Sequence, residues 1–271
     1  VIMAVYIDDN EHYFLSAYKS LCTQTIPPNE ILISIDGYIG DPLEKVIALI
    51  CRDNLVKIIR SNLNKGAGFA RNLAIKKAKY PIIAIMDADD VCDPTRFEKQ
   101  LPYIESGKAD VVGSWISEFS GNPSVQTGVR KVPENHNEIF EYGKWRQPVN
   151  HVSIIFTRTV YNKIGGYLAI RHHEDYNFIV RLLVGGVKFY NVQEVLVNVR
   201  AGSNMITRRA GKSYLKSEFK LFYGMYTQRY IGISCLIANI SFRILIRFIP
   251  KIFLETFYVK VLRAKNNAYK P

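Results

Sequence analysis

Strand-like and helix-like segments alternate throughout the first 87 residues, and this alternation constrains the fold more than any other feature of the chain. The predicted strands, each rich in β-branched residues, cover residues 1–7, 30–36, 56–60 and 81–87. The predicted helices, each with apolar residues at helical spacing, cover residues 11–24, 42–53 and 67–79. This order of elements is typical of βαβ units. It therefore predicts an α/β fold with a mostly parallel sheet flanked by helices.

The second half of the chain is less regular. Helical spacing recurs over 95–105 and in a segment that begins near Glu174 and ends at Gly185. A loop rich in Gly, Pro and Asn is predicted around 120–137. The predicted extended segments are 110–119, 152–157, 188–192 and 195–200. With 48% hydrophobic and 22% charged residues, the composition indicates a globular protein and excludes a disordered or fibrous one.

Carboxylates follow the predicted strands directly. Asp36 ends the second strand, and the fourth strand runs into Asp87, Asp89 and Asp90. In open α/β sheets, ligands bind outside the carboxyl ends of the strands. Oxygen ligands suit Mg²⁺ or Mn²⁺, and two protein carboxylates are commonly completed by a substrate diphosphate. Asp87 and Asp89 therefore predict a divalent-metal site for a nucleotide diphosphate; the alternative is a polar turn in which Asp93 caps the next helix.

Two basic segments are suited to contact that diphosphate. Lys65 and Arg71 lie in the glycine-bearing segment 64–72 at the start of a predicted helix, where the helix N-terminus favours anions. An ordinary surface salt bridge is the alternative for Arg71. The segment 198–214 contains Arg200, Arg208, Arg209 and Lys212. Arginine side chains suit phosphate groups, so we expect a lid that closes over the diphosphate.

Glu174 and Asp175 open the helix predicted near residue 174, and they are the candidate catalytic residues. A carboxylate near a metal-bound leaving group can take the proton from an attacking hydroxyl. Acids at a helix start also interact favourably with the helix dipole, so simple capping is the alternative. His151, His172 and His173 are candidate ligands or substrate contacts, although an isolated histidine is more often structural.

The net charge of +12 is concentrated near the C-terminus, because residues 201–271 contain 13 Lys and Arg but 2 Asp and Glu. The segment 231–262 is also strongly apolar, with Arg243, Arg247 and Lys251 at every fourth position. Its uninterrupted apolar run is about ten residues, half of what a spanning helix needs. A basic amphipathic helix on a membrane surface fits this composition, and a helical pair packed on the core is the alternative. Nucleic acid is not expected as a partner because Ile, Leu and Phe dominate.

The cysteines indicate a reducing compartment. Cys22, Cys51, Cys92 and Cys235 show neither a CxxC pair nor metal-ligand spacing. The segment at the start of the chain does not resemble a signal peptide. We therefore expect reduced thiols in a cytoplasmic protein.

Five segments occur in the order found in one enzyme family. They are VIMAVYIDDNEHYFLSAYKSLCTQTIPPNEILISIDG, NKGAGFARNLAIKKAKYPIIAIMDADD, DVVGS, IGGY and HEDYNFIVRLL. In these segments the chain resembles family 2 glycosyltransferases with a GT-A fold, and more narrowly the bacterial enzymes of capsule, O-antigen and exopolysaccharide assembly. The resemblance covers about residues 1–225, divided into a nucleotide-binding half 1–119 and an acceptor half 120–225. The basic amphipathic helical extension 226–271 would follow this domain.

On the donor side, the resemblance implies a UDP-sugar as substrate, with Mn²⁺ or Mg²⁺ as cofactor. Asp36 would contact the uracil, with Arg71 assisting. Asp87 would contact the ribose or the donor sugar, and Asp89 would ligate the metal.

On the acceptor side, the resemblance implies an inverting transfer to a saccharide hydroxyl, with Asp175 as the catalytic base beside Glu174. Arg208 and Arg209 would lie near the diphosphate. Acceptors in this family are commonly sugars on a lipid diphosphate at the inner face of the bacterial membrane. The extension 226–271 would hold the enzyme there as a peripheral protein.

The segment after the first strand, IDDNEHY, helps to distinguish between classes of protein. The family usually has an Asn after the Val-Tyr of this strand, so any role of Asp8 or Asp9 stays open. A nucleotidyltransferase would place a glycine-rich basic loop here, whereas this segment is acidic and lacks glycine. Two further classes stay open, namely a glycosidase with two carboxylates and a non-catalytic protein that binds anions or membranes. The residues identify neither the sugar nor the acceptor.

Overall fold

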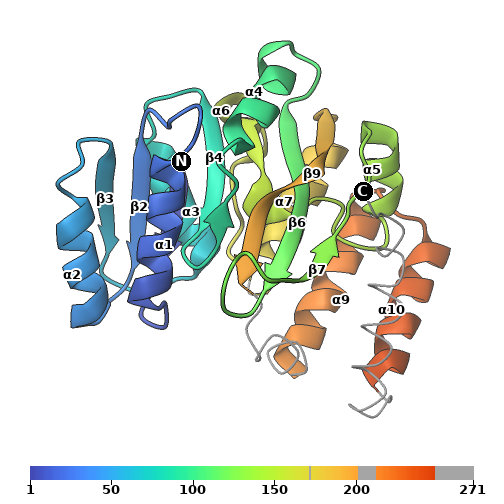
Figure 1. The fold of residues 1–271 in the computed structure, drawn as a ribbon. Coiled ribbons are helices and arrows are strands. Elements are labelled where there is room, and N and C mark those ends of the chain that lie inside the picture. Colours follow the sequence, from blue (N-terminus) through green and yellow to red (C-terminus); the bar gives the residue numbers. More distant parts are fainter. Residues whose placement is uncertain (171, 201–211, 248–271) are drawn as a thin grey trace.

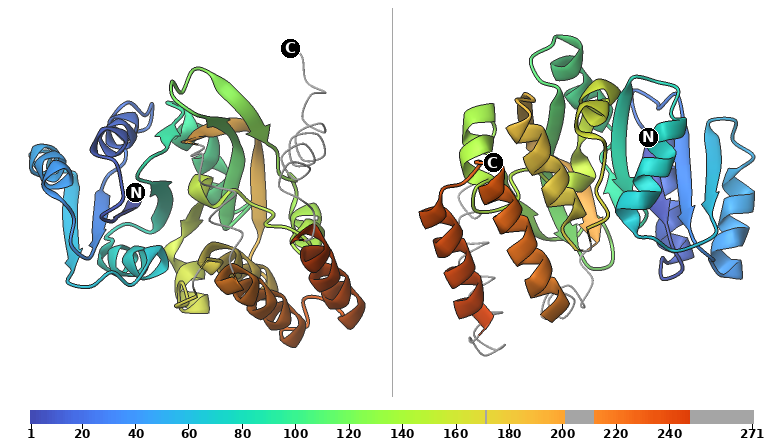
Figure 2. Two further views of the ribbon diagram at one scale, coloured as in Figure 1. Left: turned by 90° about the horizontal axis from the view of Figure 1, so that it is seen from below. Right: turned by 180° about the vertical axis from the view of Figure 1, so that it is seen from behind.

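The structure, a computed structural model, describes residues 1–170, 172–200 and 212–247, which form one mixed sheet covered by helices on both faces (Figures 1 and 2). The strands are β1 (Ile2–Val5), β2 (Ile31–Asp36), β3 (Val56–Ser61), β4 (Ile82–Asp87), β5 (Val91–Cys92), β6 (Val111–Phe119), β7 (Gln126–Arg130), β8 (Ile155–Thr157) and β9 (Phe189–Arg200). Their order is β3-β2-β1-β4-β8-β6-β9-β5, with β7 paired to β6. The expected α/β fold is confirmed.

The helices follow the predicted alternation in the first half of the chain. They are α1 (Glu11–Cys22), α2 (Asp41–Ile50), α3 (Ala67–Lys77), α4 (Arg96–Glu105), α5 (His136–Tyr142), α6 (Arg158–Ile164), α7 (Glu174–Val184), α9 (Lys212–Thr227) and α10 (Ile233–Arg247). Strands β1 to β4 are mutually parallel where they pair, and α1, α2 and α3 connect them. Asn10 starts α1 by accepting hydrogen bonds from the His12 and Tyr13 N–H groups.

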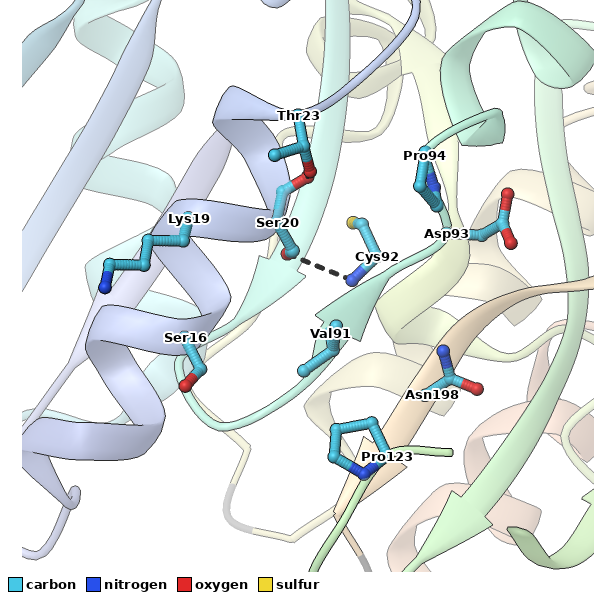
Figure 3. A pocket seen from close by; sticks show the side chains of 10 residues that line it. All are labelled: Ser16, Lys19, Ser20, Thr23, Val91, Cys92, Asp93, Pro94, Pro123 and Asn198. Carbon is cyan, nitrogen blue, oxygen red and sulfur yellow. Dashed lines mark hydrogen bonds between the residues drawn. The ribbon is translucent and has the colours of Figure 1, made fainter. Parts of the chain in front are cut away.

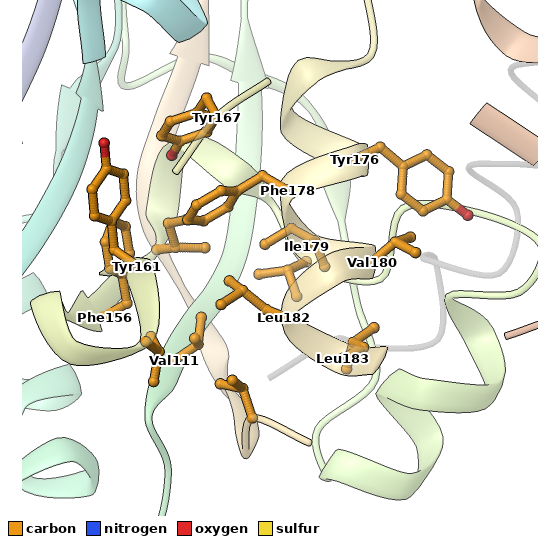
Figure 4. Packing of buried hydrophobic residues seen from close by; sticks show 14 of the residues in the cluster. Val111, Phe156, Tyr161, Tyr167, Tyr176, Phe178, Ile179, Val180, Leu182 and Leu183 are labelled. Carbon is orange, nitrogen blue, oxygen red and sulfur yellow. The ribbon is translucent and has the colours of Figure 1, made fainter. Parts of the chain in front are cut away.

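Each face of the sheet has its own hydrophobic core. One core joins the sheet to α1, α2 and α4, through residues such as Phe14, Ile47 and Phe97. The other joins it to α3, α6, α7 and α9, through residues such as Ile75 and Phe178. Figure 4 shows the aromatic part of this second core beside α7. Burial on both faces explains why β1 is a continuous apolar run and why β2 is apolar except for Ser34 and the terminal Asp36.

Three expectations for the second half need correction. The predicted loop 120–137 contains β7 and the start of α5. The predicted strand 152–157 begins as a short 3₁₀ helix, His151–Ser153, before β8. The two predicted strands at 188–192 and 195–200 are one strand, β9, which pairs in parallel with β6 through a register shift after Ser114. That irregularity accommodates the polar pair Gln193-Glu194, which interrupts the apolar pattern in the sequence.

Helices α9 and α10 pack on the second core (Figure 1). Phe222 and Met225 of α9 and Leu236 of α10 are buried there with side chains of α7. The predicted domain limit at residue 225 falls within α9. None of the described helices is both long and apolar enough to cross a membrane. The final residues of the expected extension, 248–271, lie outside the described part of the chain.

Candidate active site

Two predicted carboxylates lie at the carboxyl edge of the parallel strands, as expected. Asp36 ends β2 and Asp87 ends β4, and β1 lies between these two strands. Asp9 follows β1 in a turn, where its Oδ2 accepts a hydrogen bond of 2.9 Å from the Tyr6 N–H. Asp8 is exposed in the same turn. The edge therefore gathers acids from three connections of one sheet.

Asp36 holds the loop that leads into α3, a role that the sequence analysis did not anticipate. Its two carboxylate oxygens accept hydrogen bonds from the N–H groups of Lys65 (2.9 Å) and Gly66 (2.7 Å). Gly66 has φ +94°, a left-handed conformation that favours glycine. The Lys65 ammonium lies 4.8 Å from the centre of the Phe69 ring. Each oxygen of Asp36 keeps a second lone pair, so a contact with uracil stays a prediction.

Arg71 is buried between the edge of the sheet and the start of α7, so it does not form an ordinary surface salt bridge. Its Nη2 donates to Asp87 Oδ1 at 2.8 Å, and its Nη1 lies 3.9 Å from Glu174 Oε1. Burial opposes its positive charge, but the neighbouring Asp87, Tyr167 and Glu174 outweigh that effect and raise the pKa of Arg71. This guanidinium therefore joins the two predicted acidic groups.

Gly68 allows α3 to pack closely against the start of α7. A Cβ on Gly68 would lie 3.3 Å from side-chain carbons of both Glu174 and Tyr167. The Tyr167 ring stacks on Phe178 of α7, with 4.1 Å between ring centres (Figure 4). Close packing of α3 against these side chains places Arg71 at the sheet edge.

The acidic turn, residues 87–90, accumulates negative charge. Burial, together with Asp89 and Asp87, raises the pKa of Asp9 to about 7, although the Tyr6 N–H opposes this. Burial and the same two neighbours raise the pKa of Asp90 well above its usual range. Arg200, the last residue of β9, donates hydrogen bonds that hold the acidic turn in place. Its N–H donates to Asp90 Oδ1 at 2.9 Å and its Nε to the Asp89 carbonyl at 3.3 Å.

The acidic turn fits part of a magnesium or manganese site. In the described residues no three His, Cys, Asp or Glu side chains are grouped so that they could hold a metal ion by themselves. The turn nevertheless offers carboxylate oxygen ligands. Burial, together with repulsion between acids that a cation would relieve, raises the pKa of Asp90 in the turn and of the nearby Asp9. Asp87 and Asp89 would therefore need a substrate diphosphate to complete the ligand set.

Asp175 lies at the start of α7 with both carboxylate oxygens engaged. Gln147 Nε2 donates to Oδ2 at 3.0 Å, and the Tyr176 N–H donates to Oδ1 at 2.7 Å. Burial favours the neutral acid, but His151, these two hydrogen bonds and Arg71 together lower the pKa of Asp175. Burial and the Asp175 charge have the opposite effect on Glu174 and raise its pKa. The pKa values of the two adjacent acids are thus shifted in opposite directions.

The histidines differ in their surroundings. His151 is buried, and its Nε2 lies 2.8 Å from the Tyr167 hydroxyl. Burial and the Arg71 charge lower the pKa of His151 to about 4, so the ring is neutral at pH 7. His173 is also buried, and its Nε2 has no hydrogen-bond partner among the described residues. His172 is exposed, with φ +75°. Neither the sequence nor these contacts assign a metal to them.

Two predicted donor contacts lie outside the described residues, namely Arg208 and Arg209. Arg200 and Lys212 are the described residues on either side of that segment.

A separate cavity of about 440 Å³ opens between α1 and β5 and is lined by residues that include Lys19, Cys92 and Asn198 (Figure 3). None of the predicted site residues in the described chain lines this cavity, so we do not assign the active site to it.

Three contacts of the site could not be predicted from the sequence. Gln147 lies in the segment YGKWRQPVN, which carries no recognisable pattern. Tyr167 is the last residue of the IGGY segment, but its contact with His151 connects residues that the pattern does not relate. Arg200 was placed in the lid, whereas its contacts brace the acidic turn.

The parallel strands with carboxylates at their ends, the buried Arg71 and the acid pair on α7 together define an α/β transferase of GT-A fold. The model of Glycosyl transferase family 2 matches residues 1–165. The chain belongs to glycosyltransferase family 2, and it is a glycosyltransferase.

A relative and two solved structures agree with this assignment. The Escherichia coli UDP-Gal:alpha-D-GlcNAc-diphosphoundecaprenol beta-1,3-galactosyltransferase is 33% identical over 264 residues, which cover 97% of this chain and 96% of that protein. S. aureus TarS in complex with UDP-GlcNAc matches with a TM-score of 0.65 and 14% identity, covering 91% of this chain and 71% of that one. The Pyrobaculum calidifontis mannosyltransferase PcManGT, in complex with GDP-Man and Mn²⁺, gives 0.63 and 12%, covering 88% and 68%. These structures confirm the GT-A fold.

Proposed function

We propose that this protein transfers a sugar, with inversion, from a UDP-sugar to a hydroxyl of a saccharide carried on a lipid diphosphate, as a step in surface polysaccharide assembly. The contact of Arg71 with both Asp87 and Glu174 carries the proposal, because it joins the acidic turn and the start of α7 in one site. The E. coli relative, whose name specifies UDP-Gal and a diphosphoundecaprenol acceptor, supports both substrates.

The donor would bind along the carboxyl edge of β1, β2 and β4. Asp36 would accept a hydrogen bond from the uracil, while Lys65 and the N-terminus of α3 would face the phosphates. Asp87 and Asp89 would hold a Mn²⁺ or Mg²⁺ ion, which would supply charge neutralisation to the departing diphosphate. Arg208 and Arg209 would add positive charge from the lid.

Asp175 would act as the general base. Its lowered pKa keeps it ionised at pH 7, so the carboxylate can take the proton of the acceptor hydroxyl. The acceptor oxygen then forms the bond to the anomeric carbon while the bond from that carbon to the UDP oxygen breaks. UDP leaves with the electron pair. Glu174 would hold Arg71 and the site geometry from the adjacent position.

A screen of UDP-sugars with Mn²⁺ tests this proposal. The full chain is incubated with each UDP-sugar and a GlcNAc-diphospholipid, and the product is analysed by mass and by the NMR coupling of its new anomeric proton. One UDP-sugar should give a product of mass increased by one sugar and of inverted configuration. Release of pyrophosphate from UTP and a sugar phosphate would instead assign a nucleotidyltransferase.

We propose also that α10 and the residues after it hold the enzyme on the inner face of the membrane. In the described part of α10, large apolar side chains face solvent: Ile233, Ile237, Phe242 and Leu245 are 55%, 58%, 55% and 64% exposed. Arg243 faces α9 instead, 3.4 Å from Glu218. Lipid contact would therefore come from the apolar side chains, and the basic residues of 248–271 would favour anionic headgroups.

Vesicle flotation tests this membrane contact. Parent protein should float with phosphatidylglycerol vesicles, and a chain with Ile237→Ser and Leu245→Ser should remain in the dense fraction. Leu49→Ser on α2, where the leucine is 50% exposed, is the matched control. A deletion for this purpose should begin at residue 248, because α10 also contacts the loop before residue 147. Unchanged flotation of both the double variant and the deletion would refute lipid contact.

A further inference from the structure

Gln147 makes one hydrogen bond with its side chain and another with its backbone carbonyl. Its Nε2 donates to Asp175 Oδ2 at 3.0 Å. Its backbone carbonyl accepts a hydrogen bond of 2.8 Å from Arg130 Nη2 of β7. The side chain is therefore directed at Asp175 from a backbone that is fixed independently.

The loop between α5 and Gln147 is fixed from the opposite side by α10. Asn239 Nδ2 donates to the Lys144 carbonyl at 3.2 Å, and Arg243 Nη2 donates to the Trp145 carbonyl at 3.1 Å. The Tyr176 hydroxyl, next to Asp175 on α7, donates to the Gly143 carbonyl at 2.8 Å. The loop that contains Lys144 and Trp145 is therefore held next to Asp175 by several hydrogen bonds besides that of the Gln147 amide. Removing this amide alone should leave the loop in place.

The charged and titratable groups around Asp175 come from several elements. They are Arg71, His151, Tyr167, His173 and Glu174. Among the described side chains around Asp175, it is Gln147 that donates a hydrogen bond to its carboxylate. A carboxylate that accepts such a bond has a preferred orientation, and its charged form is favoured.

We propose that Gln147 is a positioning residue that orients the Asp175 carboxylate toward the acceptor hydroxyl. The inference rests on the proposed function, in which Asp175 is the base. With one oxygen held by Gln147 and the other by the Tyr176 N–H, the carboxylate presents a defined lone pair. Together with His151, the Tyr176 N–H and Arg71, the amide also lowers the pKa of Asp175 in a site where burial favours the neutral acid.

Two substitutions of Gln147 separate its effect on the orientation of the Asp175 carboxylate from the effect of its side-chain volume. Gln147→Leu keeps the volume but removes the donor, and it should lower kcat by about 10- to 100-fold, the range that misplacement of a reacting group produces. KM for the UDP-sugar should stay unchanged, because the donor edge lies elsewhere. Gln147→Glu adds a like charge, so the acid limb of the pH–kcat profile should move up by about one to two pH units.

A matched control and the Asp175→Asn variant keep the test decisive. Gln193→Leu removes another half-buried amide, which donates to the backbone carbonyls of Val132 and Asn191 and is not part of the proposed site, and it should leave kcat unchanged. Parent-like kcat in Gln147→Leu, together with a parent-like pH profile in Gln147→Glu, would overturn the inference. If Asp175→Asn retains full turnover, the proposed base itself is wrong; if it loses turnover while the Gln147 variants do not, only the positioning role is wrong.

Discussion

The Asp175 carboxylate at the start of α7 and the carboxylates of Asp9 and Asp90 at the sheet edge belong to the same site, and their surroundings change their pKa values in opposite directions. At the sheet edge, burial and the neighbouring acids raise the pKa of Asp9, in the turn after β1, to about 7 and that of Asp90, in the acidic turn, well above its usual range. At the start of α7, burial also opposes the charge of Asp175, but His151, Gln147, the Tyr176 N–H and Arg71 outweigh it and lower the pKa. Residue type alone does not distinguish these sites.

The difference follows from what each group has as neighbours. The acidic turn brings more negative charge together than its own surroundings neutralise, which is expected of a site that receives a cation with its ligand. The carboxylate on α7 is supplied with donors by the protein itself, which is expected of a group that must be ionised before substrate arrives. One site therefore depends on a ligand, and the other is preorganised.

Asp89→Ala should have the largest effect among the changes that test this difference. Loss of a metal ligand should lower kcat/KM by about 10³-fold, the scale of losing a main charge-stabilising group. Calorimetry of UDP binding should then give the same affinity with and without Mn²⁺, whereas the parent should bind UDP more tightly with Mn²⁺. Asp41→Ala, an exposed acid on α2, is the control. A persisting Mn²⁺ effect in Asp89→Ala would remove Asp89 from the metal site.

Arg71→Met should reduce stability by about 3 to 5 kcal/mol, because it leaves Asp87 and Glu174 without their buried partner. Arg60→Met breaks an exposed pair with Glu44 and should cost about 1 kcal/mol or less. Urea unfolding of both variants measures the two values. Equal losses would mean that Arg71 is no more than a surface ion pair.

His151→Gln tests the neutral surroundings of the base. The folded pKa of about 4 lies below the ordinary value of 6.5, so the unfolded chain binds more protons between these values. The parent should therefore lose about 3 kcal/mol of unfolding free energy as pH falls from 7 to 4 through this group. The variant should lack that part of the loss, and His12→Gln, at an exposed position, should retain it. Identical pH slopes in parent and His151→Gln would contradict a neutral buried ring.

Glu174→Gln should have the smallest effect. Glu174 is a partner of Arg71 at 3.9 Å, and its raised pKa already favours the neutral form that glutamine imitates. We expect kcat to fall by less than about tenfold, below the range for loss of a general base. A larger fall than in Asp175→Asn would exchange the roles of the two acids.

The sequence predicted what depends on local pattern. Periodicity indicated β1 to β4 and α1 to α3, and the position of Asp36 and Asp87 after apolar runs placed them at strand ends. It did not predict that Asp36 holds the loop into α3 or that Gln147 reaches Asp175, because those contacts join residues 29 and 28 positions apart. Such pairs arise from tertiary packing, which leaves no periodic trace in the chain. The pattern predicts two strands in place of β9 for a related reason: the polar pair Gln193-Glu194 interrupts the apolar pattern, and the irregular pairing with β6 that accommodates this pair is a tertiary feature.

The most direct test of the central claim measures UDP binding and turnover of Asp175→Asn in the same preparation, with Mn²⁺ present. Asparagine keeps the shape of the side chain but cannot accept the acceptor's proton. Turnover should fall by about 10²- to 10⁴-fold while UDP affinity stays at the parent value, as expected for loss of a general base alone. Turnover close to that of the parent would contradict the account, because the proton would then be taken by another group.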